Sequence, residues 1–150
     1  MSTKAMTGAG FTVTIGGTSI GQIQNAQFSG EKWSFADITN AGSPVPTGAT
    51  GLVQMEKTPT VLDPSTCEIN GIWLYNDAGQ QALTTAAQSG ALSTFVITLP
   101  KGEGQATAGA TFTFSAYVAE VPIPQVAYDK PLTWKTSLQL NTTVTISYGS

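Results

Sequence analysis

The sequence predicts a mainly β fold: a two-sheet β-sandwich or barrel with one flanking α-helix at about 77–89 and a long extended loop at about 40–65. Three observations carry this prediction. Many short segments alternate apolar and polar side chains with a period of two, which is typical of a sheet with one buried and one wet face. Turns that contain Gly or Pro separate these segments. One segment alone has apolar residues at helical spacing.

Composition indicates a single domain whose surface favours association. The 150 residues suit one domain with a hydrophobic core, which we place at 1–150. Charged residues make up 10% of the chain, against about 25% in a typical soluble protein. Hydroxyl and amide side chains take their place, so little charge repulsion opposes contact between copies.

The first part of the chain predicts an arm followed by strands. Residues 1–10 are small and predict a flexible N-terminal arm that orders only against a partner. Three strands are expected next, at 11–15, 20–28 and 33–38. Trp33 and Phe35 share one face of the third strand.

A projecting loop is expected after these strands. The segment 40–51, NAGSPVPTGATG, is dense in Gly and Pro and has little to bury, which indicates a functional or disordered loop. Strand-like residues at 52–55 and 60–62 bracket it and predict a protruding hairpin over 40–65. Pro59 and Pro64 keep these strands short or confine them to an edge.

The predicted helix follows a strand at 66–74. Asp77 suits the N-cap position, and Gln80 completes a capping-box pattern three residues later. Gly90 supplies the C-terminal stop. The apolar stripe between them consists of Ala82, Leu83, Ala86 and Ala87. A narrow stripe of small side chains suits close packing on a sheet or on a neighbouring subunit.

The C-terminal segments have the clearest strand pattern. After a strand at 94–99, two longer strands flank a proline-marked crossing, and the total is about seven strands. Their apolar faces are Phe112, Phe114, Ala116 and Val118, then Leu132, Trp134, Leu138 and Leu140, and Tyr148 is also expected in the core. The opposite faces carry hydroxyl and amide groups and almost no charge, so they offer neither catalytic groups nor a strong field.

The residue types present predict no enzyme, no cofactor and no metal. His and Arg are absent, which removes the usual general base, the commonest metal ligand and the best phosphate clamp. The carboxylates are scattered without a paired motif, and the net charge of −3 lacks a nucleic-acid-binding footprint. Cys67 stands alone in a strand-like segment, which predicts a buried structural thiol. Neither a signal peptide nor a membrane-spanning run is expected, which favours synthesis in the cytoplasm.

One family matches the order of elements in the C-terminal half. A strand precedes the helix start Asp77-Ala-Gly-Gln-Gln-Ala-Leu, and Phe95-Val-Ile-Thr-Leu-Pro, a Gly-rich turn and Phe112-Thr-Phe-Ser-Ala-Tyr-Val follow. This order is similar to that of the tail tube (major tail) proteins of long-tailed, non-contractile bacteriophages. The resemblance covers about residues 66–148, and the N-terminal hairpin and long loop agree in layout.

The resemblance implies a structural virion protein of the tail, assembled in the host bacterial cytoplasm. Copies of the chain would form hexameric rings stacked head to tail, and double-stranded DNA would pass through the lumen without specific binding. Further partners would be the tape measure, tail tip and terminator proteins, with no membrane involved. The implied inter-ring loop residues are Asn40, Ser43, Pro44, Val45, Pro46, Thr47 and Thr50. The implied lumen or subunit-seam residues are Thr113, Ser115, Tyr117, Thr133, Lys135, Ser137 and Gln139.

Other classes stay open at this point. A β-sandwich binding or adhesion module predicts a monomer or small oligomer with exposed aromatic residues in one patch. A hydrolase or lyase on a jelly-roll-like sheet predicts carboxylates that converge in a deep pocket. The inner tube of a contractile tail or secretion system predicts nearly the same sequence properties. A sheath partner would distinguish such a tube from that of a non-contractile tail.

Overall fold

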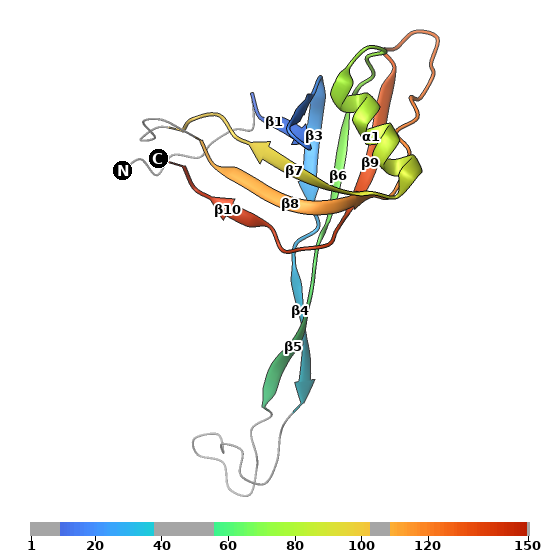
Figure 1. Ribbon diagram of the computed structural model, residues 1–150. Helices are drawn as coiled ribbons and strands as arrows, with labels where there is room; N and C mark the ends of the chain where they lie inside the picture. Colours follow the sequence, from blue (N-terminus) through green and yellow to red (C-terminus); the bar gives the residue numbers. More distant parts are fainter. Residues whose placement is uncertain (1–9, 38–55, 103–108, 150) are drawn as a thin grey trace, which may run out of the picture.

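A computed structural model describes residues 10–37, 56–102 and 109–149. Within them the chain forms ten strands and one helix (Figure 1). The first six strands are β1 (Thr12–Ile15), β2 (Thr18–Ile20), β3 (Ile23–Phe28), β4 (Lys32–Asp37), β5 (Lys57–Asp63) and β6 (Thr66–Ile72). Then come α1 (Ala78–Ser89), β7 (Leu92–Thr98), β8 (Thr111–Val118), β9 (Thr133–Leu140) and β10 (Thr145–Ser147). The predicted mainly β class with one helix is confirmed.

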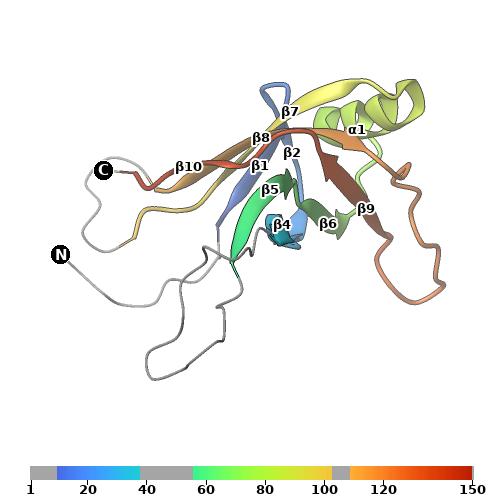
Figure 2. The ribbon, with the colours of Figure 1, turned by 90° about the horizontal axis from the view of Figure 1, so that it is seen from below.

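The body is a single antiparallel sheet that bends over itself. Its strand order is β2-β1-β7-β8-β9-β6-β3, with β10 also paired to β8. β8 pairs with β9 only from Ala116 to Val118, and its other end pairs with β10. The limb of β1, β7 and β8 therefore crosses the limb of β9, β6 and β3 at a steep angle (Figures 1 and 2). Two crossing limbs enclose a core as the two sheets of a sandwich do.

The core joins the two limbs. Its buried apolar side chains are Val13, Ile15, Ile20, Cys67, Ile69, Leu83, Ala86, Phe95, Ile97, Phe114, Ala116, Val118, Trp134, Leu138 and Leu140. Phe114 stacks on Phe95 of the same limb at a centroid distance of 5.6 Å. It also meets Phe28 of the opposite limb edge-on at 5.3 Å. Both are geometries that aromatic pairs prefer, so they fix how the limbs face each other.

The helix forms as its capping residues predict. The Asp77 side chain accepts a hydrogen bond from the Gln80 amide, and Gly90 ends the helix with a left-handed φ of 69°. Leu83 and Ala86 bury the apolar stripe against the core, where α1 packs on β1, β2 and β8. Across the described residues, no helix has the length and hydropathy of a membrane-spanning segment.

Two strand predictions and one core prediction were wrong in detail. The expected strand at 20–28 is divided by Gly21 and Gln22, and the φ of 58° at Gln22 turns the chain from one limb to the other. The final strand is likewise interrupted between Leu140 and Thr145, so ten strands replace about seven in the described parts. Tyr148 lies beyond β10 with 77% of its surface exposed, and it does not join the core.

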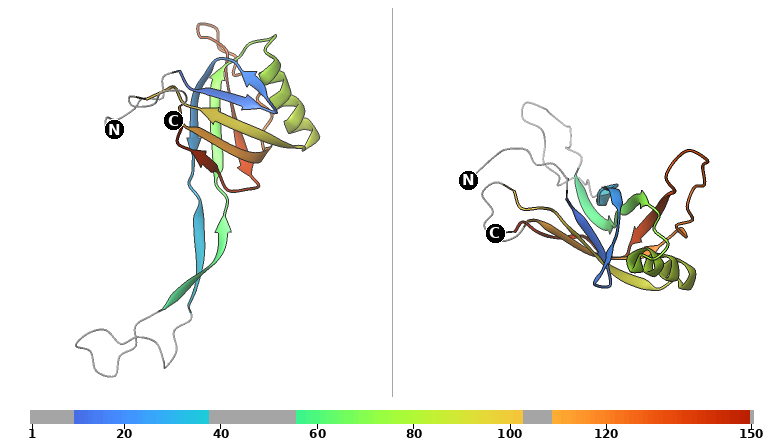
Figure 3. Two further views of the ribbon diagram at one scale, coloured as in Figure 1. Left: turned by 60° about the vertical axis from the view of Figure 1, so that its left-hand side comes forward. Right: turned by 90° about the horizontal axis from the view of Figure 1, so that it is seen from above.

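β4 and β5 form a separate two-stranded sheet, which we call the arm. It extends away from the body, as Figure 1 and the left view of Figure 3 show. The predicted strand at 60–62 lies within β5, but its partner is β4. The predicted strand at 52–55 and residues 1–9 lie outside the described residues.

Candidate functional site: two apolar surfaces and a polar sheet face

The arm presents one apolar face, which we call the arm face. Trp33 lies opposite Leu62, and Phe35 lies opposite Pro59. Residues directly opposite in an antiparallel pair point to the same side of the ribbon. The register shifts between Ser34 and Phe35, and this bulge brings the two pairs to one side.

The arm face has nothing to cover it within the described residues. Trp33 is 52% exposed and Phe35 is 59% exposed. Charges lie only at the two ends of the arm, where Lys32 faces Asp63 and Asp37 faces Lys57. A two-stranded ribbon alone is at best marginally stable in water, and grouped exposed aromatics mark an interaction surface. The arm therefore has the features of an interaction surface.

The root of the arm is fixed to the body, which sets the direction of the arm. The Ser29 amide donates to the Thr66 carbonyl at 2.9 Å, and the Thr66 amide donates back to the Ser29 hydroxyl at 2.9 Å. The Val144 amide donates to a Glu31 carboxylate oxygen at 2.6 Å, a bond between the arm root and the link from β9 to β10. The arm is therefore held at its base on two sides.

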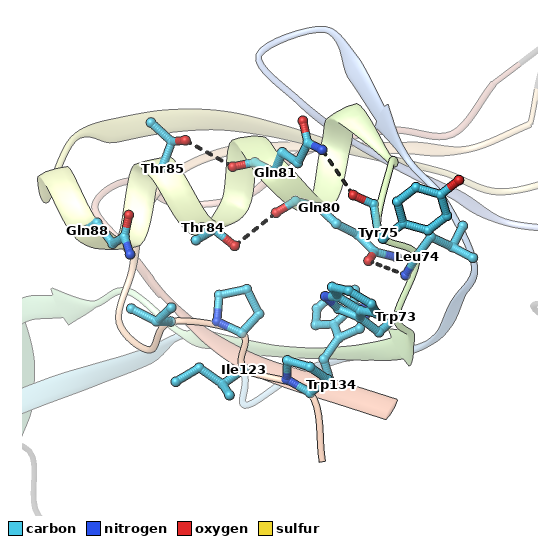
Figure 4. Close-up of a pocket in the computed structure, with 13 residues that line it drawn as sticks. Trp73, Leu74, Tyr75, Gln80, Gln81, Thr84, Thr85, Gln88, Ile123 and Trp134 are labelled. Carbon is cyan, nitrogen blue, oxygen red and sulfur yellow. Dashed lines mark hydrogen bonds between the residues drawn. The ribbon is translucent and has the colours of Figure 1, made fainter. Parts of the chain in front are cut away.

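A groove lies at the far end of the body from the arm, between α1 and segment 121–124. We call it the helix groove; its volume is about 520 Å³. Trp73 and Trp134 lie on one side of it, and Thr84 and Gln88 of α1 form the wall that faces Ile123 (Figure 4). Tyr75 and Ile123 at its border are 76% and 74% exposed. The residues that line it are all uncharged.

Gln80 holds the walls of the helix groove together. Its side-chain oxygen accepts from the Leu74 amide at 2.8 Å, and its amide nitrogen donates to the carbonyls of Ile72 and Gly21 at 2.9 and 3.1 Å. Only half of the predicted capping box forms, because the Gln80 side chain bonds these three backbone groups. This junction between α1, β6 and the turn after β2 fixes the position of Trp73.

Segment 121–124 is held by backbone bonds to its surroundings. The Ile123 amide donates to the Val121 carbonyl at 2.8 Å, which closes a tight turn. The Gln125 amide donates to the Thr133 carbonyl at 2.7 Å. The groove therefore has two fixed walls. Sequence reasoning missed it, although the run Val121-Pro-Ile-Pro offered the signal of apolar residues in a loop.

The predicted lumen or seam residues fall on two limbs. Tyr117 of β8 and Gln139 of β9 lie directly opposite each other. The other β8 members, Thr113 and Ser115, lie on the first limb, and the other β9 members face β6 on the second limb. These are Thr133, Lys135 and Ser137. The seven residues therefore share one ladder only at the bend of the sheet.

The first limb carries a wider hydroxyl face than the sequence indicated. Register places threonine and serine side by side across four strands, in the row Thr12, Thr98, Thr111 and Ser147. The next row is Thr14, Val96, Thr113 and Thr145. Neither row holds a charge. We call these rows, with Thr94 and Ser115, the hydroxyl face.

Cys67 has the environment of a structural thiol. It is fully buried on β6. Burial raises the pKa of the thiol from 9.0 to about 12, because the thiolate would lose its hydration. A thiol that stays protonated is a poor nucleophile. Among the described residues, no three His, Cys, Asp or Glu side chains cluster to hold a metal ion.

The predicted loop residues from Asn40 to Thr50 lie outside the described residues. They lie between β4 and β5 in the sequence. Their role as ring contacts stays a prediction.

Comparison with known proteins gives matches in structure only. No protein-family model and no curated protein sequence matches the chain. A chain from the tube-terminating cap of the anti-feeding prophage aligns with a TM-score of 0.72 at 12% identity, covering 99% of this chain and 95% of that chain. A chain from the tail of an empty GTA particle with C6 symmetry aligns at 0.66 and 10% identity, covering 95% and 99%.

Two further matches widen the set. A chain of the PVC sheath-tube complex, from an extracellular contractile injection system, aligns at a TM-score of 0.65 and 11% identity, covering 92% of this chain and 88% of that chain. The SPP1 tail tube aligns at 0.58 and 15% identity, covering 93% and 77%. The protein therefore has the fold found in these tail and injection-system tube assemblies.

Proposed function

We propose that the protein is a tail tube subunit, a structural protein whose copies form hexameric rings stacked head to tail as the conduit for DNA delivery. The observation that supports this proposal most directly is the arm face. In a chain with a tail-tube fold, Trp33 and Phe35 are exposed on a ribbon that extends away from the body. Such a projection gives a head-to-tail contact, and contacts of that kind build open filaments rather than closed dimers.

The inter-ring contact is assigned to the arm and its connecting loop. The loop residues from Asn40 to Thr50 lie between β4 and β5 in the sequence, so the arm would carry them toward the next ring. Deleting 42–50 is expected to leave a folded domain that no longer polymerises. Loss of folding on this deletion would instead make the loop part of the core.

The hydroxyl face is assigned to the wall of the channel. A passage for DNA needs a surface that is wet and weakly attractive, because each Lys or Arg on a phosphate adds salt-sensitive attraction. Thr113 and its neighbours meet this need with hydroxyl groups, apart from Val96, and without any charge. A subunit seam would carry more apolar area at its centre, whereas Val96 is the single apolar residue of the rows that define this face. Thr113→Cys in assembled tubes should react with a small maleimide. Complete protection of this cysteine from the reagent would indicate that the hydroxyl face lies in a subunit seam instead.

The further partners in this proposal are the tape measure, tail tip and terminator proteins, in a virion tail assembled in the host cytoplasm. The support is general: the matched structures include a tube-terminating cap and a sheath-tube complex. The inner tube of a contractile system has the same fold, and a sheath protein bound around the tube would identify that case.

Electron microscopy of the purified, concentrated protein tests the proposal. Hollow tubes or stacked rings of uniform width are the expected result. A monomer over a wide concentration range would contradict it and would favour the adhesion-module alternative, since that class also predicts exposed aromatics in one patch. A carbohydrate or protein ligand bound by the monomer through Trp33 and Phe35 would confirm that alternative.

A further inference from the structure

We propose that the arm face of one subunit binds in the helix groove of a second copy of the chain. This inference rests on the proposed function, because it names the two surfaces that meet when copies stack. It assigns a specific partner surface to Trp33 and Phe35, and it gives the uncovered apolar residues beside α1 a role.

The two surfaces match in chemistry. The arm face offers two aromatic rings flanked by Leu62 and Pro59, with charge only at the ends of the arm. The helix groove is lined by tryptophan, proline, branched apolar, glutamine and threonine side chains and by no charged group. Joining them removes apolar surface from water, and the groove places no charged side chain against the two rings, so no charge of the groove has to be desolvated.

Three polar side chains of the groove wall are already hydrogen-bonded within the chain, so a partner can cover them. The Thr84 and Thr85 hydroxyls donate to the carbonyls of Gln80 and Gln81 in their own helix, at 3.2 and 3.0 Å. The Gln81 side-chain nitrogen Nε2 donates to the Tyr75 carbonyl at 3.1 Å. Burying an unpaired polar group would oppose binding, whereas these groups keep their bonds when the groove is covered.

The positions of the two surfaces favour contact between copies. The arm extends from one end of the body, and α1 with segment 121–124 lies at the other end (Figures 1 and 3). The bonds of Ser29 and Glu31 hold the arm in that direction, so an arm cannot reach the groove of its own chain. A contact between opposite ends repeats from copy to copy without closing.

A second apolar hollow offers a competing acceptor. It has a volume of about 640 Å³ between the limbs, and Phe11, Phe28 and Phe112 line it. Gly10, where the described chain begins, also lines it, so the chain's own N-terminal residues stand next to it in sequence. Every residue that lines the helix groove continues on both sides into described chain, so the helix groove is the better acceptor for an arm.

Cysteine cross-linking separates the two acceptors. Phe35→Cys protein is mixed with Thr84→Cys protein, whose cysteine lies in the helix groove, or with Asn25→Cys protein, whose cysteine lies at the second hollow. The mixtures are assembled, oxidised and run on a non-reducing gel. Ser34→Cys, on the opposite face of the arm, is the matched donor control. Cys67 does not compete, because it is buried.

The expected result is a Phe35–Thr84 cross-link that forms at least roughly tenfold faster than the Phe35–Asn25 and Ser34–Thr84 cross-links. Tubes that form while the Phe35 cysteine links to position 25, or to neither position, would overturn the inference and leave the proposed function standing. A sample that shows no multimer and no cross-link at any concentration would overturn both.

Charge exchange gives an independent readout. Phe35→Lys alone should abolish assembly, because an ammonium group would be buried in an uncharged groove. Combining it with Thr84→Glu should restore assembly in part, since the two charges would then meet. Failure of Thr84→Glu to rescue, together with rescue by Asn25→Glu, would place the arm in the second hollow.

Discussion

The body and the arm of this protein handle apolar side chains in opposite ways. The body buries Phe95, Phe114 and Trp134 between two limbs of one bent sheet. The arm uses the same class of residue at Trp33 and Phe35 and leaves both more than half exposed. A folded monomer gains by burying such groups. The core of the body is therefore complete within one chain, whereas we propose that another molecule completes the arm.

The two regions also differ in what fixes their shape. Within the body, Gln80 bonds three backbone groups and the limbs interlock through aromatic contacts. The arm is held by its own ladder and by a fixed root at Ser29 and Glu31. Substitutions in the body should change the stability of the fold, and substitutions in the arm should change assembly.

The largest effect is expected from Gln80→Leu in the body. It leaves the Leu74 amide and the carbonyls of Ile72 and Gly21 without their partner, at about 1–3 kcal/mol for each buried group. We expect the free energy of unfolding in urea to fall by roughly 3–5 kcal/mol, and assembly to fail as a consequence. Gln88→Ala, exposed on the same helix, is the control and should shift stability by less than about 0.5 kcal/mol. Equal effects of the two variants would show that the junction is unimportant.

The double variant Trp33→Ser, Phe35→Ser should separate the arm from the body. Unfolding of the body should stay within about 0.5 kcal/mol of the parent. Each ring has about half of its surface left to bury, worth roughly 1–2 kcal/mol, so the critical concentration for assembly, measured by sedimentation, should rise at least about 30-fold. Val61→Ser removes an apolar group from the opposite face of the arm and should have the smaller effect. Unchanged assembly of the double variant would refute the role of the arm face.

Cys67 gives a smaller effect that is confined to the body and to high pH. Its folded pKa of about 12 exceeds the unfolded value of 9.0, so the folded state keeps a proton that the unfolded state releases. Stability is therefore unaffected below pH 9 and declines as the pH rises from 9 toward 12, by roughly 1.4 kcal/mol at pH 10. Urea unfolding of the parent and of Cys67→Ala at pH 8 and 10 isolates the contribution of the thiol to the pH dependence of stability. An identical decline in both proteins would rule it out.

The smallest expected effect comes from the arm root. Glu31→Ala removes the acceptor for the Val144 amide and loosens the direction of the arm, with little change in unfolding. Assembly should weaken roughly twofold to fivefold by sedimentation, because less than about 1 kcal/mol of positioning is lost. Glu31→Gln keeps an acceptor oxygen and should assemble as the parent does. A Gln variant as weak as the Ala variant would indicate a role for the charge itself.

Local chemistry explains which parts of the fold were predictable from sequence. The helix was predictable because Asp77 and Gly90 act on neighbouring residues, and the two C-terminal strands because their alternation is long. The break at Gly21 was hidden because Ile20, Ala26 and Phe28 continue one parity across it. Its amide donates to the Asp77 carboxylate, 56 residues away in sequence, and no local pattern contains that contact.

The candidate site was predictable only in part. Trp33 and Phe35 share a face by simple alternation, but their exposure depends on β4 pairing with β5 and nothing else. The hydroxyl face follows from register between strands distant in sequence, which joins Thr12 to Thr98 and Thr111. The helix groove brings Trp73, Thr84 and Ile123 together from three separate segments. Register and groove are tertiary properties, so single strands could not reveal them.

Hydrogen exchange of the backbone amides, in dilute protein and in pelleted assemblies, tests most directly whether another copy completes the arm. Amides of β4 and β5 should exchange quickly in dilute protein, because an isolated ribbon opens readily. They should become protected on assembly by at least roughly a hundredfold, while amides of β6 and β9 stay equally protected in both samples. Arm amides that exchange equally fast in dilute and assembled protein would contradict the account.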